Sequence, residues 1–301
     1  MIKPAVDVII AAVPRDRSQV TRDLVALSKP RVLLMVLAST LAGYFVALDG
    51  PADLARVIHV LVGTFMAAGG TLALNQYVER DVDALMERTR RRPLPDHRLQ
   101  PLEALLFAAM LTSVGVTYLA VSVGIAVAGL TLATTILYLG AYTPLKTRSA
   151  LCMLVGAVPG ALPPVTGWVA ARGDLGPGAV VLFGILFLWQ LPHTLAIAHL
   201  YASDYARAGV RVPSAVGSLG AKPEQAIVWS TLALVTVSLL PVPIGMSGAV
   251  YLATACALGL AFLGAGLAHA SAASPISARR VLLASLLYLP LLLAVLALDM
   301  P

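Results

Sequence analysis

Runs of about 20 apolar residues recur along this 301-residue chain and constrain its fold more than any other feature. A helix of that length crosses a hydrocarbon core of about 30 Å. The composition agrees, because 59% of the residues are hydrophobic and only 12% are charged, whereas a soluble chain carries about a quarter of charged residues. The sequence therefore predicts an all-α, polytopic membrane protein.

Breaks rich in charged residues, proline or glycine divide these runs into nine predicted spans. They cover residues 30–48, 54–77, 102–120, 122–141, 150–171, 177–200, 224–244, 248–268 and 280–299. No low-complexity linker separates them, so we expect a single domain over residues 1–301. The first 29 residues lack a small-residue cleavage pattern. We expect them to form a retained cytoplasmic segment at the membrane surface.

The basic residues predict the orientation, because Lys and Arg concentrate in cytoplasmic loops. All 21 of them except Arg56 and Arg172 fall in the N-terminal segment or in loops on one side. We therefore expect a multi-pass protein of the inner (plasma) membrane, with its N-terminus in the cytoplasm and its C-terminus outside. The net charge of +6 is then a mark of cytoplasmic loops rather than of nucleic-acid binding. We expect membrane lipid, and no nucleic acid, as a partner.

Residues 75–95, NQYVERDVDALMERTRRRPLP, gather both signs of charge between two apolar runs. Asn75, Glu79 and Asp83 are four residues apart, a spacing that places them on one helical face. An amide and two carboxylates at a membrane boundary suit Mg²⁺, which binds a few carboxylates together with phosphate oxygens. The arginines expected to neutralise remaining phosphate charge are Arg88 and Arg92. The alternative is an orientation-setting loop whose charges pair with one another.

Two further polar loops fall on the same predicted side. Residues 200–213 place one carboxylate between two aromatic side chains: Tyr201, Asp204 and Tyr205. Residues 142–149, YTPLKTRS, contribute Tyr142 and Lys146. Taken alone, the basic residues here are orientation signals. The three loops together favour a diphosphate site.

The chain resembles the UbiA-type intramembrane prenyltransferases. The stretches that carry the resemblance are SKPRVLLMVLASTLAGY (28–44), residues 75–95, YTPLKTRS, VGAVPGALPPVTGW (155–168) and FLWQLPHTLAIAHLYASDYARAG (187–209). The segments GAVPGALPP and WQLPH resemble the branch of this family whose acceptor is heme. The resemblance implies a nine-helix bundle around a central cavity, with a cytoplasmic cap over the cavity mouth.

The resemblance also implies a reaction and a set of site residues. The farnesyl group of farnesyl diphosphate is transferred to a vinyl group of heme b, giving heme O and diphosphate, with Mg²⁺ as the cofactor. Heme A synthase or terminal-oxidase assembly proteins are the implied partners. The implied catalytic residues are Asn75, Glu79, Asp83, Arg88, Arg92, Lys146 and Asp204. The implied metal ligands are Glu79, Asp83 and Asp204. The implied substrate contacts are Tyr142, His193, Tyr201 and Tyr205.

Two other functions stay open. The first, implied by the same family resemblance, is prenylation of an aromatic or quinone precursor, which acidic neighbours of Asp204 in place of Ala202 and Ser203 and the absence of WQLPH would favour. The second is transport, because proline-broken helices are typical of transporters, although here the ionisable residues cluster in loops. His193 also has two interpretations: it contacts the acceptor, or it satisfies backbone groups that Pro192 leaves free.

Overall fold

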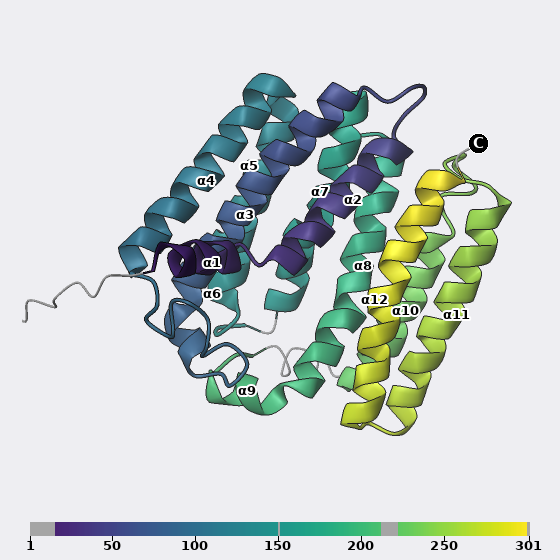
Figure 1. The fold of residues 1–301 in the computed structure, drawn as a ribbon. Coiled ribbons are helices and arrows are strands. Elements are labelled where there is room, and N and C mark those ends of the chain that lie inside the picture. The colour runs from purple at the N-terminus through teal and green to yellow at the C-terminus, as the bar shows by residue number, and fades with distance from the viewer. Residues whose placement is uncertain (1–15, 150, 212–221, 300–301) are drawn as a thin grey trace, which may run out of the picture.

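The computed structural model describes residues 16–149, 151–211 and 222–299, and these residues form helices and no β-strand (Figure 1). The predicted N-terminal segment is therefore described only from Asp16 onward, and residues 1–15 lie outside the described part. The helices are α1 Arg17–Leu27, α2 Pro30–Val46, α3 Leu54–Ala84, α4 Pro101–Ser122, α5 Ile125–Ile136, the π-helix η1 Leu137–Tyr142, α6 Thr143–Leu145, α7 Cys152–Arg172, α8 Pro177–Leu200, α9 Ala202–Arg207, α10 Pro223–Ser238, α11 Ala249–Ser271 and α12 Pro275–Leu298.

Seven helices in the described ranges are long and apolar enough to cross a membrane, with α5 to α6 counted as one. An eighth is added if α1 and α2, bent by 49°, form one span. The chain is thus an all-helical, multi-pass membrane protein. The 16-residue α10 is shorter than predicted, because Pro241 and Pro243 follow and proline cannot continue a helix.

The helix α3 is longer than predicted, and this difference matters for the site. It runs to Ala84 instead of ending near residue 77. A side chain of Asp53 caps its start by accepting a hydrogen bond from the N–H of Arg56 at 3.1 Å. The first part of the charged motif, through Asp83, is thus part of the same helix as the apolar run.

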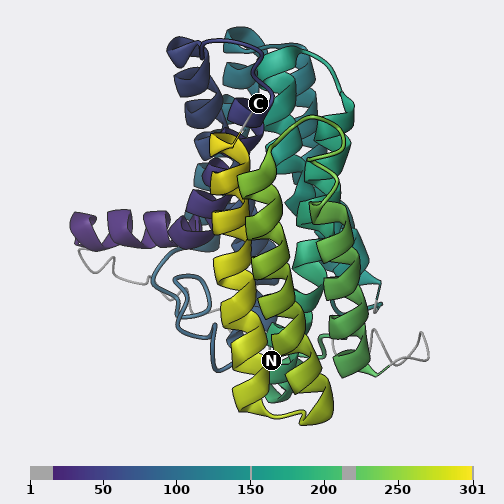
Figure 2. The ribbon, with the colours of Figure 1, turned by 90° about the vertical axis from the view of Figure 1, so that its right-hand side faces the viewer.

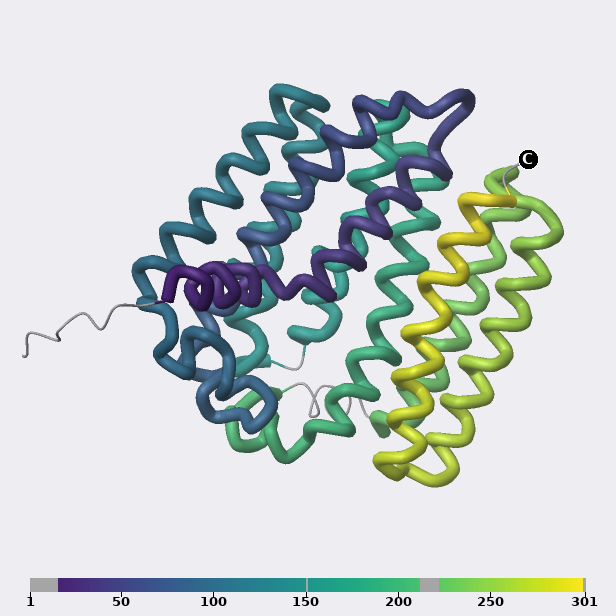
Figure 3. Tube along the Cα trace, viewed as in Figure 1, coloured from purple at the N-terminus to yellow at the C-terminus, as the bar shows by residue number. Residues whose placement is uncertain are grey.

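The helices pack as neighbouring pairs across the bundle (Figures 1 and 3). α3 packs along α4, and α2 packs along α7. α8 contacts α7, α10 and α12, and α11 in turn contacts α10 and α12. The α2–α7 crossing is close, since a Cβ on Gly43 or Gly167 would overlap the facing carbonyl oxygen of Pro164 or Thr40. Small residues allow such approach in membrane bundles.

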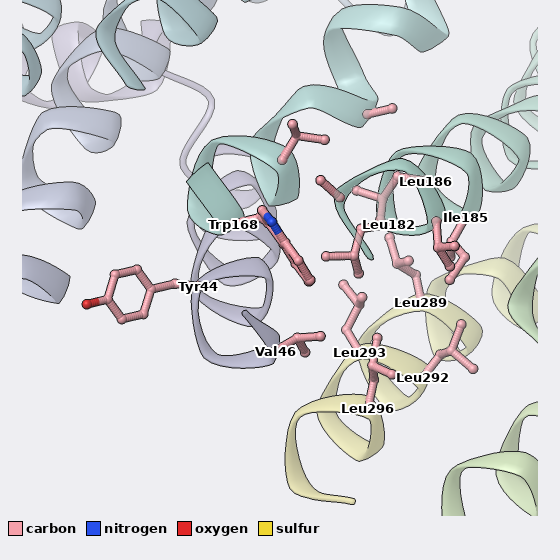
Figure 4. Close-up of a cluster of buried hydrophobic side chains, with 14 of the residues drawn as sticks. Tyr44, Val46, Trp168, Leu182, Ile185, Leu186, Leu289, Leu292, Leu293 and Leu296 are labelled. Carbon is pink, nitrogen blue, oxygen red and sulfur yellow. The ribbon is translucent and has the colours of Figure 1, made fainter. Parts of the chain in front are cut away.

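The apolar core joins α8 to α12 and α7. Leu182 and Leu186 of α8 lie opposite Leu289 and Leu293 of α12, with Trp168 of α7 beside them (Figure 4). All five are at most 5% exposed. This tight packing fixes α8 relative to its neighbours, because close van der Waals contact stabilises helix pairs in lipid.

α1 runs across the direction of the bundle helices rather than along it (Figure 2). Buried Asp23 of α1 forms an ion pair with Arg98 in the loop before α4. The side chain of Gln76 in α3 donates hydrogen bonds to the carbonyl oxygens of Ala26 and Leu27, at 3.1 and 2.8 Å. α1 is therefore fixed at the end of the bundle where α9 and the loop after α3 also lie (Figure 1).

Candidate active site

The predicted polar face of α3 is present at its C-terminal end. Asn75, Glu79 and Asp83 all belong to one continuous helix, and the three residues are 0%, 9% and 1% exposed. Buried carboxylates are costly unless they are paired. The charged groups that pair with Glu79 and Asp83 therefore indicate which ligands the site can bind.

Each of the two carboxylates is paired with a cation that the sequence singled out. Lys146 Nζ lies 2.5 Å from Glu79 Oε1, and Arg92 Nη1 lies 2.6 Å from Asp83 Oδ2. The hydroxyl of Thr89 also donates to the backbone carbonyl of Asp83, at 2.8 Å. The loop after α3 thus folds back on the helix and returns its arginine to the acidic face.

Lys146 is held in place by an aromatic ring as well as by its carboxylate. Its Nζ lies 4.5 Å from the centroid of the Tyr142 ring, a distance at which a cation attracts the ring face. Burial by itself lowers the pKa of Lys146, but Tyr142 and Glu79 outweigh that effect and raise its pKa above the ordinary value. The ammonium group therefore stays charged.

Lys29 is a member of this cluster that sequence reasoning assigned only to membrane orientation. Its Nζ donates to Asn75 Oδ1 at 2.7 Å, and Asn75 Nδ2 donates to Thr143 Oγ1 at 3.2 Å. The amide of Asn75 thereby connects the start of α2 with α6. Lys29 is 46 residues from Asn75 in sequence, and no spacing rule links positions that far apart.

The expected central cavity lies next to this cluster. It has a volume of about 290 Å³ and is lined by residues of α2, α3, α5, η1, α7 and α8. Most of the lining is apolar or threonine, with Tyr138 and Tyr142 at the η1 end. Because Tyr142 contacts both the cavity and Lys146, the cavity borders the charged cluster. The two tyrosine rings lie 5.2 Å apart, on a π-helical turn of a kind that often marks functional sites.

Asp204 has different partners from those predicted. Its two carboxylate oxygens accept hydrogen bonds from the backbone N–H groups of Glu87 and Arg88, at 3.3 and 3.2 Å, and it pairs with Arg207. Burial raises its pKa, but the N–H groups of Arg88 and Glu87 and the Arg207 guanidinium outweigh this and lower the pKa below its usual value. Asp204 therefore fastens α9 to the loop after α3.

The other residues predicted around Asp204 lie on either side of this contact. The exposed Arg88 guanidinium lies 5.3 Å from the ring centroid of Tyr201. Tyr205 is partly buried in the apolar cluster that also contains Tyr142. Of these three, only Tyr205 is thereby linked to the cavity-lining side chains.

His193 points toward α12. Its Nδ1 lies 2.8 Å from Ser285 Oγ, and its ring stacks on Trp189 at 4.7 Å between centroids. Its neighbours Gln190 and Thr194 line the cavity, whereas His193 does not. His193 therefore links α8 to α12 through the Ser285 side chain, a partner that neither interpretation named, and its contact with the acceptor stays a prediction.

Two carboxylates of α3 fit Mg²⁺, whereas Asp204 lies against the loop after α3. Glu79 and Asp83 are buried oxygen donors one helical turn apart, and Mg²⁺ is commonly bound by one or two carboxylates plus substrate phosphates. Across the described ranges, no three His, Cys, Asp or Glu side chains converge closely enough to hold a metal ion. Asp204 does not group with Glu79 and Asp83 there, and its role as a third ligand stays a prediction.

Comparison with known proteins gives the family directly. The model of the UbiA prenyltransferase family matches residues 36–289. The chain belongs to the UbiA prenyltransferase family. It is accordingly a prenyltransferase, and a transporter role is set aside.

Curated relatives cover almost the whole chain. The protoheme IX farnesyltransferase of Solibacter usitatus (strain Ellin6076) is 43% identical over 289 residues, which are 93% of this chain and 99% of that protein. The protoheme IX farnesyltransferase of Myxococcus xanthus (strain DK1622) is 40% identical over 282 residues, covering 93% and 95% of the two chains.

Solved structures show the same fold at low sequence identity. A digeranylgeranylglyceryl phosphate synthase superposes with a TM-score of 0.77 at 15% identity, over 94% of this chain and 98% of that one. A UbiA homolog from Archaeoglobus fulgidus bound to GPP and Mg²⁺ superposes with a TM-score of 0.62 at 15% identity, over 91% and 99%.

Proposed function

We propose that this prenyltransferase transfers the farnesyl group of farnesyl diphosphate to a vinyl group of heme b, giving heme O and diphosphate. The relatives that are about 40% identical over nearly the full length are protoheme IX farnesyltransferases, which supports the heme acceptor. The observation that carries the proposal is the apolar cavity that ends at a buried cluster of paired charges. An isoprenoid diphosphate has the same division into an apolar tail and an anionic head.

The charged cluster is suited to bind and release the diphosphate. Lys146 and Arg92 now neutralise Glu79 and Asp83. Glu79 and Asp83 would hold Mg²⁺, which supplies a Lewis acid for the charge that develops on the leaving diphosphate. Lys146 and Arg92 can then exchange their carboxylates for phosphate oxygens, because charge-assisted hydrogen bonds to phosphate are strong. Fixed cations at the leaving group stabilise charge that forms in the transition state.

The tyrosines of η1 are placed to act on the other half of the donor. As the bond between farnesyl C1 and oxygen breaks, the electron pair leaves with the diphosphate and positive charge develops on the allylic carbons. Tyr138 and Tyr142 line the cavity, with Tyr142 in contact with Lys146, and their rings can stabilise that charge. The terminal vinyl carbon of heme then bonds to C1, and water adds to the adjacent carbon with loss of a proton.

The orientation of the protein in the membrane decides from which side the diphosphate enters. We infer that the cluster faces the cytoplasm from an inner (plasma) membrane, with the N-terminus inside and the C-terminus outside, because nearly all Lys and Arg lie on that side. α9 and the loop after α3 then form the cap over the cavity, and α2 and α10 complete nine crossings. Heme A synthase or terminal-oxidase assembly proteins are the expected users of the product.

Heme extraction tests the acceptor. Membranes containing the chain, prepared from a host that makes no heme O, are incubated with heme b, farnesyl diphosphate and Mg²⁺, and extracted hemes are identified by mass. We expect the wild-type membranes to form heme O. Membranes containing the Glu79→Gln variant serve as the matched control and should form none. Prenylation of an added aromatic or quinone precursor, with heme b unchanged, would instead favour the alternative acceptor.

A further inference from the structure

Lys29 stands in a strained backbone conformation at the junction of α1 and α2. Its φ and ψ are 47° and 68°, in the left-handed region. An L-residue with a side chain rarely adopts this region, and a following proline disfavours helical conformations further. The next residue is Pro30. Strain of this kind persists only where the surroundings impose it, and it concentrates at functional sites.

The surroundings of Lys29 do impose this conformation. The side chain of Gln76 is 2% exposed and donates to the carbonyl oxygens of Ala26 and Leu27, immediately before the junction. The N–H of Lys29 donates to Ala26 O at 3.2 Å, and Leu27 is fully buried. The break between the helices is therefore fixed against α3, and it aims the Lys29 side chain at the polar face.

The Lys29 ammonium differs from the other two cations of the cluster in having no anionic partner. Lys146 pairs with Glu79 and Arg92 pairs with Asp83. Within the described ranges Lys29 has no ion pair, and its Nζ donates only to the neutral Asn75 oxygen. An ammonium has three donors, so two are uncommitted. The charged groups that face it are Glu79, Asp83, Lys146 and Arg92.

A partly buried cation without an ion-pair partner of its own is unfavourable. It becomes favourable once an anion enters. We propose that Lys29 is a diphosphate-binding residue: its Nζ binds a phosphate oxygen of the prenyl donor, and the strained junction serves to place it there. This inference rests on the proposed function only in that the donor is a prenyl diphosphate. It requires no particular acceptor.

Binding of inorganic diphosphate tests the inference without the acceptor. The purified full-length protein and its variants are titrated with inorganic diphosphate in the presence of Mg²⁺ by calorimetry. We expect Lys29→Met to weaken binding by roughly 10- to 100-fold, the usual effect of losing a hydrogen bond from a charged group. The matched control is Arg31→Met, which removes an exposed basic residue two positions away and should leave the affinity unchanged.

A glycine variant separates binding from folding. Glycine adopts positive φ without strain, so Lys29→Gly should keep or raise the thermal unfolding midpoint while losing diphosphate affinity as Lys29→Met does. The inference is overturned if either variant binds inorganic diphosphate as the wild type does, or if Lys29→Gly lowers affinity and unfolding midpoint together. If binding falls as expected while extracted heme stays unmodified, only the proposed acceptor is wrong.

Discussion

The polar end of α3 and the polar segment from α8 to α9 have similar residues in sequence but different partners in the structure. Glu79 and Asp83 pair with side-chain cations, Lys146 and Arg92, and such partners can leave when a metal or a phosphate arrives. Asp204 also pairs with a side-chain cation, Arg207, but both of its oxygens accept in addition from backbone N–H groups of the loop after α3, which are less free to move away than a side chain. The comparison teaches that a carboxylate's partner, more than its motif, indicates its role.

The largest effect is expected at the exchangeable carboxylates. Glu79→Gln or Asp83→Asn should lower turnover by roughly 10²- to 10³-fold, the usual range for losing one element of transition-state charge stabilisation. Activity is measured as heme O formed across a Mg²⁺ titration. The matched control is Asp81→Asn, because Asp81 is exposed and pairs only with Arg80, at 3.8 Å. Near-normal turnover in both Glu79→Gln and Asp83→Asn would show that these carboxylates do not bind the metal, and would contradict the role assigned to the end of α3.

A somewhat smaller effect is expected when an exchangeable cation is removed. Lys146→Met should lower kcat/KM for farnesyl diphosphate by about 10²-fold, since fixed cations stabilise the leaving group. Arg148→Met, two residues on and exposed, is the control for general loss of positive charge. An equal loss in both variants would show that the cluster acts through net charge and not through the Glu79 contact.

Substitution of Asp204 sharpens the contrast between the two regions. Asp204→Ala should lower the unfolding midpoint and raise KM for farnesyl diphosphate several-fold, since it leaves the N–H groups of Glu87 and Arg88 without their acceptor. Asp204→Asn keeps one acceptor oxygen, so its unfolding midpoint and its KM should lie between those of the wild type and of Asp204→Ala. Neither variant should change the Mg²⁺ concentration that gives half-maximal activity. A shift in that concentration as large as the one for Glu79→Gln would make Asp204 a metal ligand.

The smallest effect is expected at His193. His193→Ala and Ser285→Ala both remove the α8–α12 hydrogen bond, so each should lower stability by about 1 kcal/mol and change activity only slightly. Thermal unfolding and heme binding are measured in parallel. If His193→Ala abolishes heme binding while Ser285→Ala leaves it intact, His193 contacts the acceptor as the sequence resemblance implied.

Much of the fold could be predicted from the sequence, because the apolar runs and their breaks determine where helices lie. The shared face of Asn75, Glu79 and Asp83 followed from helical periodicity, which is a local property. The end of α10 was misplaced because the apolar run continues past Ser238 through Pro241 and Pro243, and hydrophobicity alone does not register the missing N–H groups.

What the sequence could not predict at the site are contacts between distant segments. Lys29 reaches Asn75 only because Gln76 fixes the α1–α2 junction, and nothing in SKPR indicates that contact. Asp204 was assigned to the metal by its motif, but its partners are backbone groups on another loop. His193 faces Ser285 because of how α8 packs on α12. Tertiary packing decides each of these, and residue spacing carries no information about it.

The most direct test is a structure of the protein with Mg²⁺ and an unreactive farnesyl diphosphate analogue. The account predicts the tail in the cavity and Mg²⁺ about 2.0–2.1 Å from oxygens of Glu79 and Asp83, with Lys146 and Arg92 turned from those carboxylates to the phosphates. A diphosphate bound away from α3, with the Glu79–Lys146 and Asp83–Arg92 pairs unbroken, would contradict it.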